Sequence, residues 1–217
     1  MREEFQAQLS ELREQLAGMC ELATSAMRSA GRVVFDADED LARQVLAGDA
    51  ELDRARDRCE ETVQQLLALQ APVARDLRLV LAVLYCADKI ERMGDLAAHV
   101  AETARLGERP VPPELESAFT DLGETAIRMA ERLAELIRRP DECGFAEMHE
   151  TDRTVDTLHA GVMAAITDPE WSHGVPAATS LALLARYYER FADQAVSVAR
   201  RLDFAVTGHV PAARVGG

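Results

Sequence analysis

Apolar residues recur at intervals of three and four along most of the chain, and the alternation typical of a β-strand is absent. This spacing predicts helices, because it lines up one apolar stripe along each helix. Prolines and glycine-containing turns divide the pattern into six long segments. The expected helices cover residues 4–34, 39–68, 74–106, 113–138, 143–166 and 177–204.

The third and sixth of these helices repeat one another at an offset of 98 residues. Each carries an unbroken apolar seam. The two seams are Leu79, Val83, Cys86, Ile90, Met93, Ala97 and Val100, and Ala177, Leu181, Leu184, Tyr188, Phe191, Ala195 and Val198. The phrase Glu-Arg-x-x-Asp also occurs once in each helix, starting at Glu91 and at Glu189. A duplicated seam with a duplicated acidic phrase indicates an internal repeat.

The repeat predicts an all-α chain of two tandem three-helix bundles. The first bundle is expected at residues 1–107 and the second at residues 114–206. Between them, residues 108–113 lie in the proline-rich stretch GERPVPPE and are expected to form a linker. The last segment, residues 207–217, is expected to be a flexible tail.

Four pairs of acidic residues at i,i+4 spacing follow the same repeat. On a helical wheel, the pairs of the third and sixth helices lie roughly opposite the apolar seam and should point away from the bundle core. The pairs of the second and fifth helices flank the apolar stripe of their own helix. These eight residues are Asp49 and Asp53, Glu91 and Asp95, Asp152 and Asp156, and Glu189 and Asp193.

These acids suggest a cation site in each bundle. If the two acid-bearing helices of a bundle are antiparallel neighbours, four carboxylates meet in a small area and repel one another. Hard cations that prefer oxygen ligands would relieve the repulsion, and iron, zinc, manganese and magnesium are the candidates. The alternative is a solvated acidic face, in which Arg92 and Arg190 pair with neighbouring acids.

The charge balance narrows the classes of partner. The chain has 24 Lys and Arg against 38 Asp and Glu, a formal net charge of −14. Nucleic acids and anionic membrane surfaces both need clustered Lys and Arg, so neither is expected. No apolar run approaches the ~18 residues of a membrane span, and the charged N-terminal stretch MREEFQAQLSELREQL does not resemble a signal peptide. We therefore expect a cytoplasmic protein.

Three stretches resemble the PhoU family: LLALQAPVARDLRLV, ADKIERMGDLAAHV and LLARYYERFADQAVSVARRL. The similarity runs from about Glu4 to Phe204. Its specific motifs are Gln-x-Pro-Val-Ala-x-Asp-Leu-Arg before the third helix and Glu-Arg-x-x-Asp within it. The loop DPEWSHGV is similar to loops of actinobacterial members. The family often has Asp-His-Ala after the Glu-Arg phrase, whereas Leu96 and Gln194 follow the aspartates here, so any role of that histidine is absent.

The resemblance implies a phosphate-signalling protein built of two three-helix-bundle repeats. PhoU-like proteins act with the ATPase of the phosphate ABC transporter and with a sensor histidine kinase. They restrain phosphate uptake and repress the phosphate-starvation response when phosphate is plentiful. They are commonly homodimers and reach the membrane through partners, without direct insertion. Their acidic motifs can carry metal clusters, often iron or zinc, which here would fall on the eight carboxylates named above.

Other function classes remain to be weighed. A ferritin-like metal-binding protein needs Glu-x-x-His pairs from two helices, and this chain has one near-match, Asp156-x-x-His159. Without a glycine-rich phosphate loop, G-x-S-x-G or Cys/His metal spacing, no enzyme is expected. A metal-independent helical adaptor, whose acids dock a basic partner, is the main alternative. Direct phosphate binding would need Arg, Lys or helix N-termini, which the shared acidic face does not offer.

Overall fold

Six long helices account for nearly all of the residues that the structure describes. The computed structural model describes residues 2–105 and 111–208, and these ranges contain no strand. The helices are α1 (Arg2–Asp36), α2 (Glu39–Gln70), α3 (Ala74–Ala104), α4 (Glu116–Arg138), α5 (Glu142–Ile166) and α6 (Gly174–Thr207), with a short 3-10 helix, η1 (Pro113–Leu115), before α4. The prediction of an all-α fold is confirmed.

Local chemistry sets the helix boundaries. Asp38 caps α2, because its Oδ1 accepts a hydrogen bond from the backbone N–H of Leu41 at 3.0 Å. Asp141 caps α5 in the same way, accepting from the N–H of Gly144 at 2.6 Å. α2 ends before Ala71, which adopts a left-handed conformation (φ 41°) next to Pro72. The sharp turn that results brings α3 back alongside α2.

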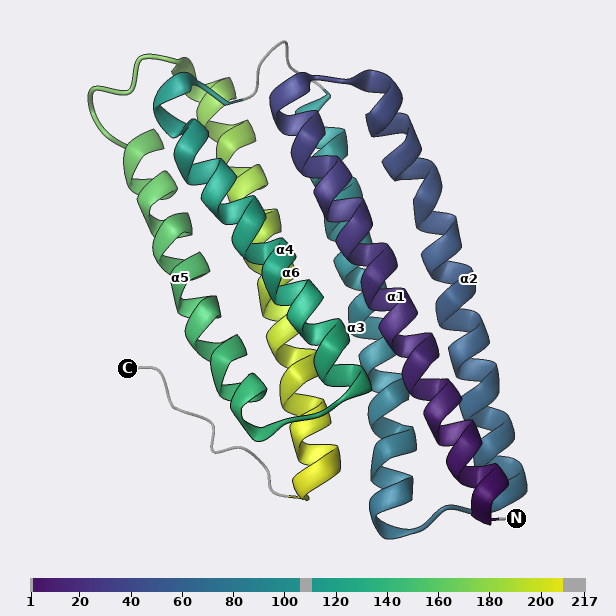
Figure 1. Ribbon diagram of the computed structural model, residues 1–217. Helices are drawn as coiled ribbons and strands as arrows, with labels where there is room; N and C mark the ends of the chain where they lie inside the picture. The colour runs from purple at the N-terminus through teal and green to yellow at the C-terminus, as the bar shows by residue number, and fades with distance from the viewer. Residues whose placement is uncertain (1, 106–110, 209–217) are drawn as a thin grey trace.

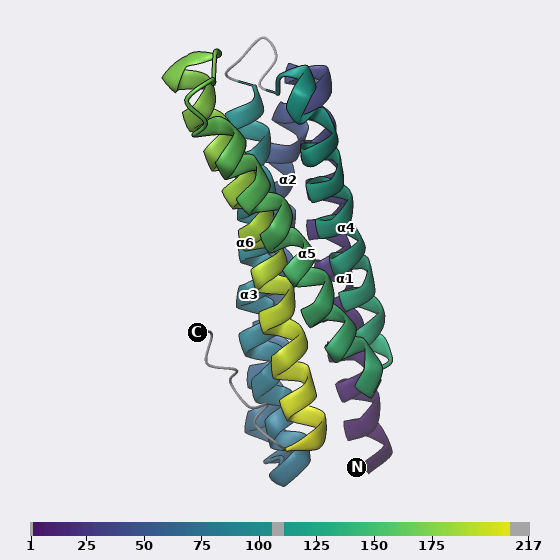
Figure 2. The ribbon, with the colours of Figure 1, turned by 90° about the vertical axis from the view of Figure 1, so that its left-hand side faces the viewer.

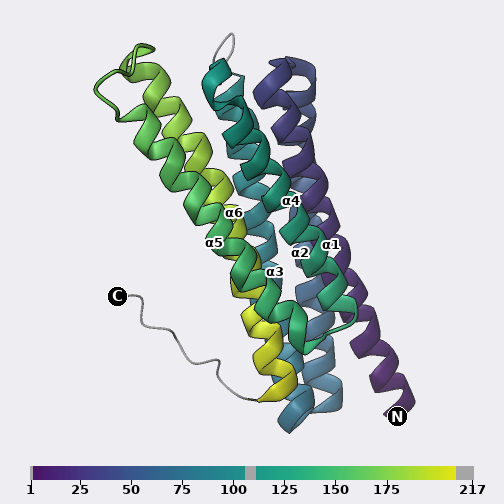
Figure 3. The same ribbon diagram turned by 60° about the vertical axis from the view of Figure 1, so that its left-hand side comes forward.

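The helices form two three-helix bundles, α1–α2–α3 and α4–α5–α6 (Figure 1). α3 packs on α6 and α1 packs on α4, so these four helices form the junction, with α2 and α5 at its flanks. Figure 2 shows α3 and α6 on one side of the molecule and α1 and α4 on the other. Figure 3 shows α4 and α5 side by side with α3 behind them. The predicted pair of bundles is therefore confirmed.

α3 and α6 run antiparallel along the junction. Near one end, the rings of His99 and Tyr187 stack with their centroids 5.3 Å apart. Nearer the other end, the thiol of Cys86 lies 4.0 Å from the carbonyl oxygen of Val198. The two repeated helices therefore lie antiparallel, as equivalent helices do when an approximate twofold axis relates the two halves.

The apolar seams fill the core. Ile90, Met93 and Phe191 have no exposed side-chain surface, and Tyr188 is 1% exposed. Gly94 lets α3 approach α2 closely, because a Cβ at this position would lie only 2.3 Å from Cδ2 of Leu52. The Leu52 side chain of α2 therefore packs directly on the backbone of α3, between the two helices that carry the acids of the first bundle.

The expected helix ends are close to the observed ones, and α6 shows the largest change. It begins at Gly174 and reaches Thr207, which lengthens the predicted helix at both ends. Pro113, expected at the end of the linker and the start of the fourth helix, begins η1, and α4 itself begins at Glu116. Residues 106–110, which include much of the predicted linker, and residues 209–217 of the predicted tail lie outside the described residues. The proposed domain limits therefore stay predictions.

Candidate metal and contact site

The four acids of the first bundle meet between α2 and α3, and we call them the α2–α3 quartet: Asp49, Asp53, Glu91 and Asp95. Burial and then the charge of Asp95 raise the pKa of Asp49, and Asp53 raises it further. Burial and then the charge of Asp95 also raise the pKa of Glu91, and Asp53 contributes. The two pairs therefore lie within electrostatic reach of one another, as the sequence predicted for antiparallel neighbours.

The prediction that the acids of α3 point away from the bundle core holds only in part. The side chain of Glu91 is only 16% exposed, whereas that of Asp53 is 48% exposed. The side of α3 opposite its seam does not face solvent alone, because α3 packs against α1, α2 and α6. The quartet is therefore a half-buried cluster, in which charge is more costly than on an open face.

Arg56 of α2 reaches into the α2–α3 quartet. Its Nη1 lies 2.9 Å from Oε1 of Glu91 and 3.7 Å from Oδ1 of Asp53. The side chain of Arg56 is 28% exposed, so this contact is partly shielded from water. A guanidinium therefore supplies part of the positive charge that a metal ion would bring. Sequence analysis missed it, although its position one turn after Asp53 was visible.

The α5–α6 quartet repeats the arrangement with Asp152, Asp156, Glu189 and Asp193. Burial, followed by the charges of Asp156, Asp193 and Glu189, raises the pKa of Asp152 to about 6. The pKa of Glu189 is raised by burial and by Asp193. The pKa of Asp193 is raised by burial, although Arg186 opposes the shift. The fold thus assembles all eight predicted residues into two groups of four.

The two quartets differ in how their charge is balanced. The position equivalent to Arg56, 103 residues later, is His159, at the offset that relates Asp49 to Asp152. Glu189 is balanced instead by Arg186 on its own helix, with Nη1 2.5 Å from Oε1. Its other oxygen, Oε2, is buried and has no hydrogen-bond partner among the described residues.

The unpartnered oxygen makes the α5–α6 quartet the better fit for a cation. Carboxylate oxygens suit hard cations, and the imidazole of His159 suits zinc or iron. However, in the described part of the chain no three His, Cys, Asp or Glu side chains stand in a ready-made metal-binding arrangement. Metal binding would therefore require side-chain adjustment, and it stays a prediction.

Comparison with known proteins places this architecture in a family. A family model described as the PhoU domain matches residues 16–104 and residues 119–202, one match in each bundle. The chain belongs to the PhoU family. The resemblance seen in the sequence is thereby confirmed.

Similar proteins span almost the full chain. A Mycobacterium leprae protein named phosphate-specific transport system accessory protein PhoU homolog 1 is 42% identical over 213 residues, covering 97% of this chain and 96% of that protein. Homolog 2 of Mycobacterium tuberculosis is 41% identical, covering 97% of this chain and all of that protein. These matches fit an actinobacterial-like member. The crystal structure of a PhoU regulatory protein from Streptococcus pneumoniae has the same fold, with a TM-score of 0.88 at 22% identity, covering 95% of this chain and 99% of that one.

Proposed function

We propose that this chain is a cytoplasmic, non-enzymatic negative regulator of phosphate uptake and of the phosphate-starvation response. It acts by contact with the ATPase of a phosphate ABC transporter and with a sensor histidine kinase, and it works as a homodimer. The observation that carries the proposal is the 42% identity, over nearly the whole chain, to a protein named as an accessory of phosphate-specific transport. The family name supplies the pathway, and the fold supplies a rigid helical platform.

The two acidic quartets are the proposed contact surfaces. The formal net charge of −14 and the two quartets favour partners with basic patches. Such contacts weaken as salt screens them. No helix in the described ranges is long and apolar enough to cross a bilayer.

The α5–α6 quartet is the proposed metal site. Asp152, Asp156, Glu189 and Asp193 would hold the ion, and the buried Oε2 of Glu189 supports this assignment because a cation would give it a partner. The ion would supply positive charge that relieves carboxylate repulsion and could bridge to a partner. The α2–α3 quartet is the weaker candidate, since Arg56 already occupies its interior.

A reporter of phosphate-starvation genes tests the regulatory role. Deleting the gene in its host should switch the reporter on in phosphate-rich medium, and the wild-type chain should switch it off again. A deletion strain without paralogues whose reporter stays off would refute the role.

The contribution of the quartets is tested by complementing the same strain with two charge-matched variants. The test variant carries Glu91→Gln, Asp95→Asn, Glu189→Gln and Asp193→Asn. The control neutralises four exposed acids elsewhere: Glu11→Gln, Asp36→Asn, Asp121→Asn and Glu124→Gln. We expect the control to restore repression and the test variant to fail.

Calorimetric titration of chelator-treated protein with Mn²⁺, Fe³⁺ and Zn²⁺ tests the metal separately. Binding should be lost when Asp152 and Glu189 are changed to amides and should persist when Asp49 and Glu91 are changed. Equal titrations of all three proteins would reject the α5–α6 site.

A metal-independent adaptor is the second candidate function. The observation that favours it is the Arg56 guanidinium, which balances the α2–α3 quartet without any ion. Under this reading, chelator-treated protein keeps its full affinity for the transporter ATPase, whereas the four-amide test variant still fails to repress the reporter, because the acids themselves make the contact.

A further inference from the structure

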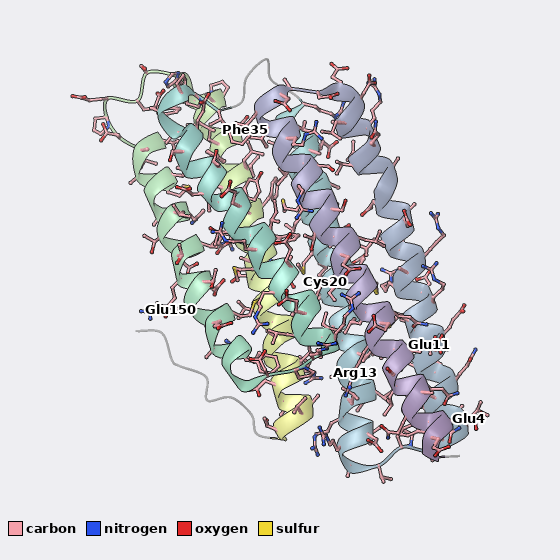
Figure 4. All side chains as sticks on the ribbon, in the orientation of Figure 1. Glu4, Glu11, Arg13, Cys20, Phe35 and Glu150 are labelled. Atoms are coloured by element: carbon pink, nitrogen blue, oxygen red, sulfur yellow. The ribbon has the colours of Figure 1, made fainter. Side chains whose placement is uncertain are left out.

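One end of this acidic molecule carries an open cavity with basic walls. α1 and α3 begin at this end and α6 finishes there (Figure 1). The cavity has a volume of about 600 Å³ and lies between these three helices. Its walls include the apolar side chains of Phe5 and Leu9 and the guanidinium groups of Arg13 and Arg75. Figure 4 shows Arg13 on the lower part of α1.

The two guanidinium groups are close enough to repel one another. Partial burial, and then the charge of Arg75, lower the pKa of Arg13. Neither arginine forms an ion pair with any described residue, whereas Arg132 contacts three acids and Arg138 contacts two. Asp76, which also lines the cavity, is the one acid among its walls.

Two further features make this end attractive to an anion. The N-terminus of α3 lies at the cavity, and its N-cap residue, Val73, provides no side-chain hydrogen bond, although Asp76 in the first turn offsets part of the positive helix dipole there. Arg78, one turn after Arg75, has a buried Nε without a hydrogen-bond partner among the described residues. The Arg78 guanidinium lies against Gly208 at the end of α6, where it also balances that helix's negative end.

We propose that this cavity binds a small organic phosphate such as a nucleotide, with its phosphates on Arg13 and Arg75 and its apolar part against Phe5 and Leu9. Arginine matches phosphate oxygens with two parallel hydrogen bonds, which gives both charge and geometry. The volume of about 600 Å³ falls within the range of small-molecule pockets and exceeds the needs of inorganic phosphate. The proposal does not depend on the transporter contact, so each can fail without the other.

Calorimetry on the full-length chain tests the site, with ATP, AMP, inorganic phosphate and sulfate as probes. Chelator is present throughout, so that phosphate held by a metal at the quartets does not register. ATP should bind, and inorganic phosphate and sulfate should bind much more weakly. Arg13→Gln and Arg75→Gln should each weaken ATP binding about 10- to 100-fold, the loss expected for a charged hydrogen bond. Arg32→Gln, an exposed arginine at the far end of α1, should leave it unchanged.

Thermal melting separates lost binding from lost folding. Without ligand, Arg75→Gln should melt no lower than wild type, because it removes repulsion with Arg13. ATP should raise the melting temperature of wild type and of Arg32→Gln, and not that of Arg75→Gln. The proposal would be overturned by an absence of ATP binding at millimolar concentration, or by ATP affinity of Arg13→Gln and Arg75→Gln equal to that of wild type. Equal affinity of the wild-type chain for inorganic phosphate and ATP would also overturn it.

Discussion

At the scale of single residues, Asp152 is an acid whose ionisation the fold opposes, because its surroundings raise its pKa. Its pKa of about 6 in the folded chain lies above the ordinary value of 3.8. The folded state therefore holds the proton more tightly than the unfolded state. The stability this provides is fully present below the unfolded pKa and is lost as the pH rises through about 6. At neutral pH, an ionised Asp152 weakens the apo protein.

Removing that charge should stabilise the metal-free protein. We expect Asp152→Asn to raise the free energy of unfolding by about 1–2 kcal/mol near pH 7.5, a value discounted for partial exposure. The gain should vanish near pH 3, below the ordinary pKa, where Asp152 is largely protonated in both states. Denaturant titrations at the two pH values measure it, with the exposed Asp121→Asn as control. A gain independent of pH would show that this carboxyl group is not the cause.

Arg56 should govern whether the α2–α3 quartet accepts a cation. Arg56→Gln leaves Glu91 and Asp53 without their guanidinium partner. We expect it to destabilise the apo protein by about 1–2 kcal/mol and to raise the affinity of the α2–α3 quartet for Mn²⁺. Calorimetry is done in a background with Glu189→Gln and Asp193→Asn, so that only the α2–α3 quartet titrates. Mn²⁺ affinity equal to that of the background protein would contradict the competition between Arg56 and a metal.

At the scale of helices, the close contact of α2 and α3 depends on Gly94. Gly94→Ala would place a methyl group 2.3 Å from Cδ2 of Leu52, so the Leu52 side chain must change its rotamer or the two helices must move apart. We expect a loss of about 1–3 kcal/mol, the usual cost of overpacking. Gly48→Ala on α2 is the matched control, because no atom lies within 4 Å of its new Cβ, and it should gain about 0.5–1 kcal/mol. Denaturant unfolding compares the two, and a Gly94→Ala protein as stable as Gly48→Ala would contradict the close packing.

The helices were predictable from the sequence, and the environment of the acids was not. Spacing of three and four residues fixes which positions of a helix share a face, so the seam from Leu79 to Val100 could be assigned directly. Which neighbours cover the other faces depends on packing between segments far apart in the chain. The burial of Glu91 follows from the three helices around α3, and Arg13 and Arg75 come to line one cavity only through the packing of α1 against α3. Neither leaves a periodic signal.

At the scale of the whole molecule, the junction of α1, α3, α4 and α6 should make the two bundles unfold together. Met93 is fully buried in the first bundle, and Met93→Asp should cost about 3–5 kcal/mol, as an unpaired buried charge does. The only tryptophan, Trp171, lies just before α6 in the second bundle. Its fluorescence transition should move to lower denaturant together with the circular dichroism transition. A Trp171 transition unchanged by Met93→Asp would show two independent folding units.

The replacement of Arg56 by His159 at equivalent positions has a consequence for stoichiometry. If the two quartets belonged to two identical subunits of a dimer, both quartets would carry the same residue at this position. A tandem repeat within one chain is free of that constraint, so its two quartets can differ in sequence while the two bundles keep the same fold. A cation titration of this protein should therefore fill one site per chain well before a second. A molecule with a ligand at only one of its two quartets should be a distinct, stable state.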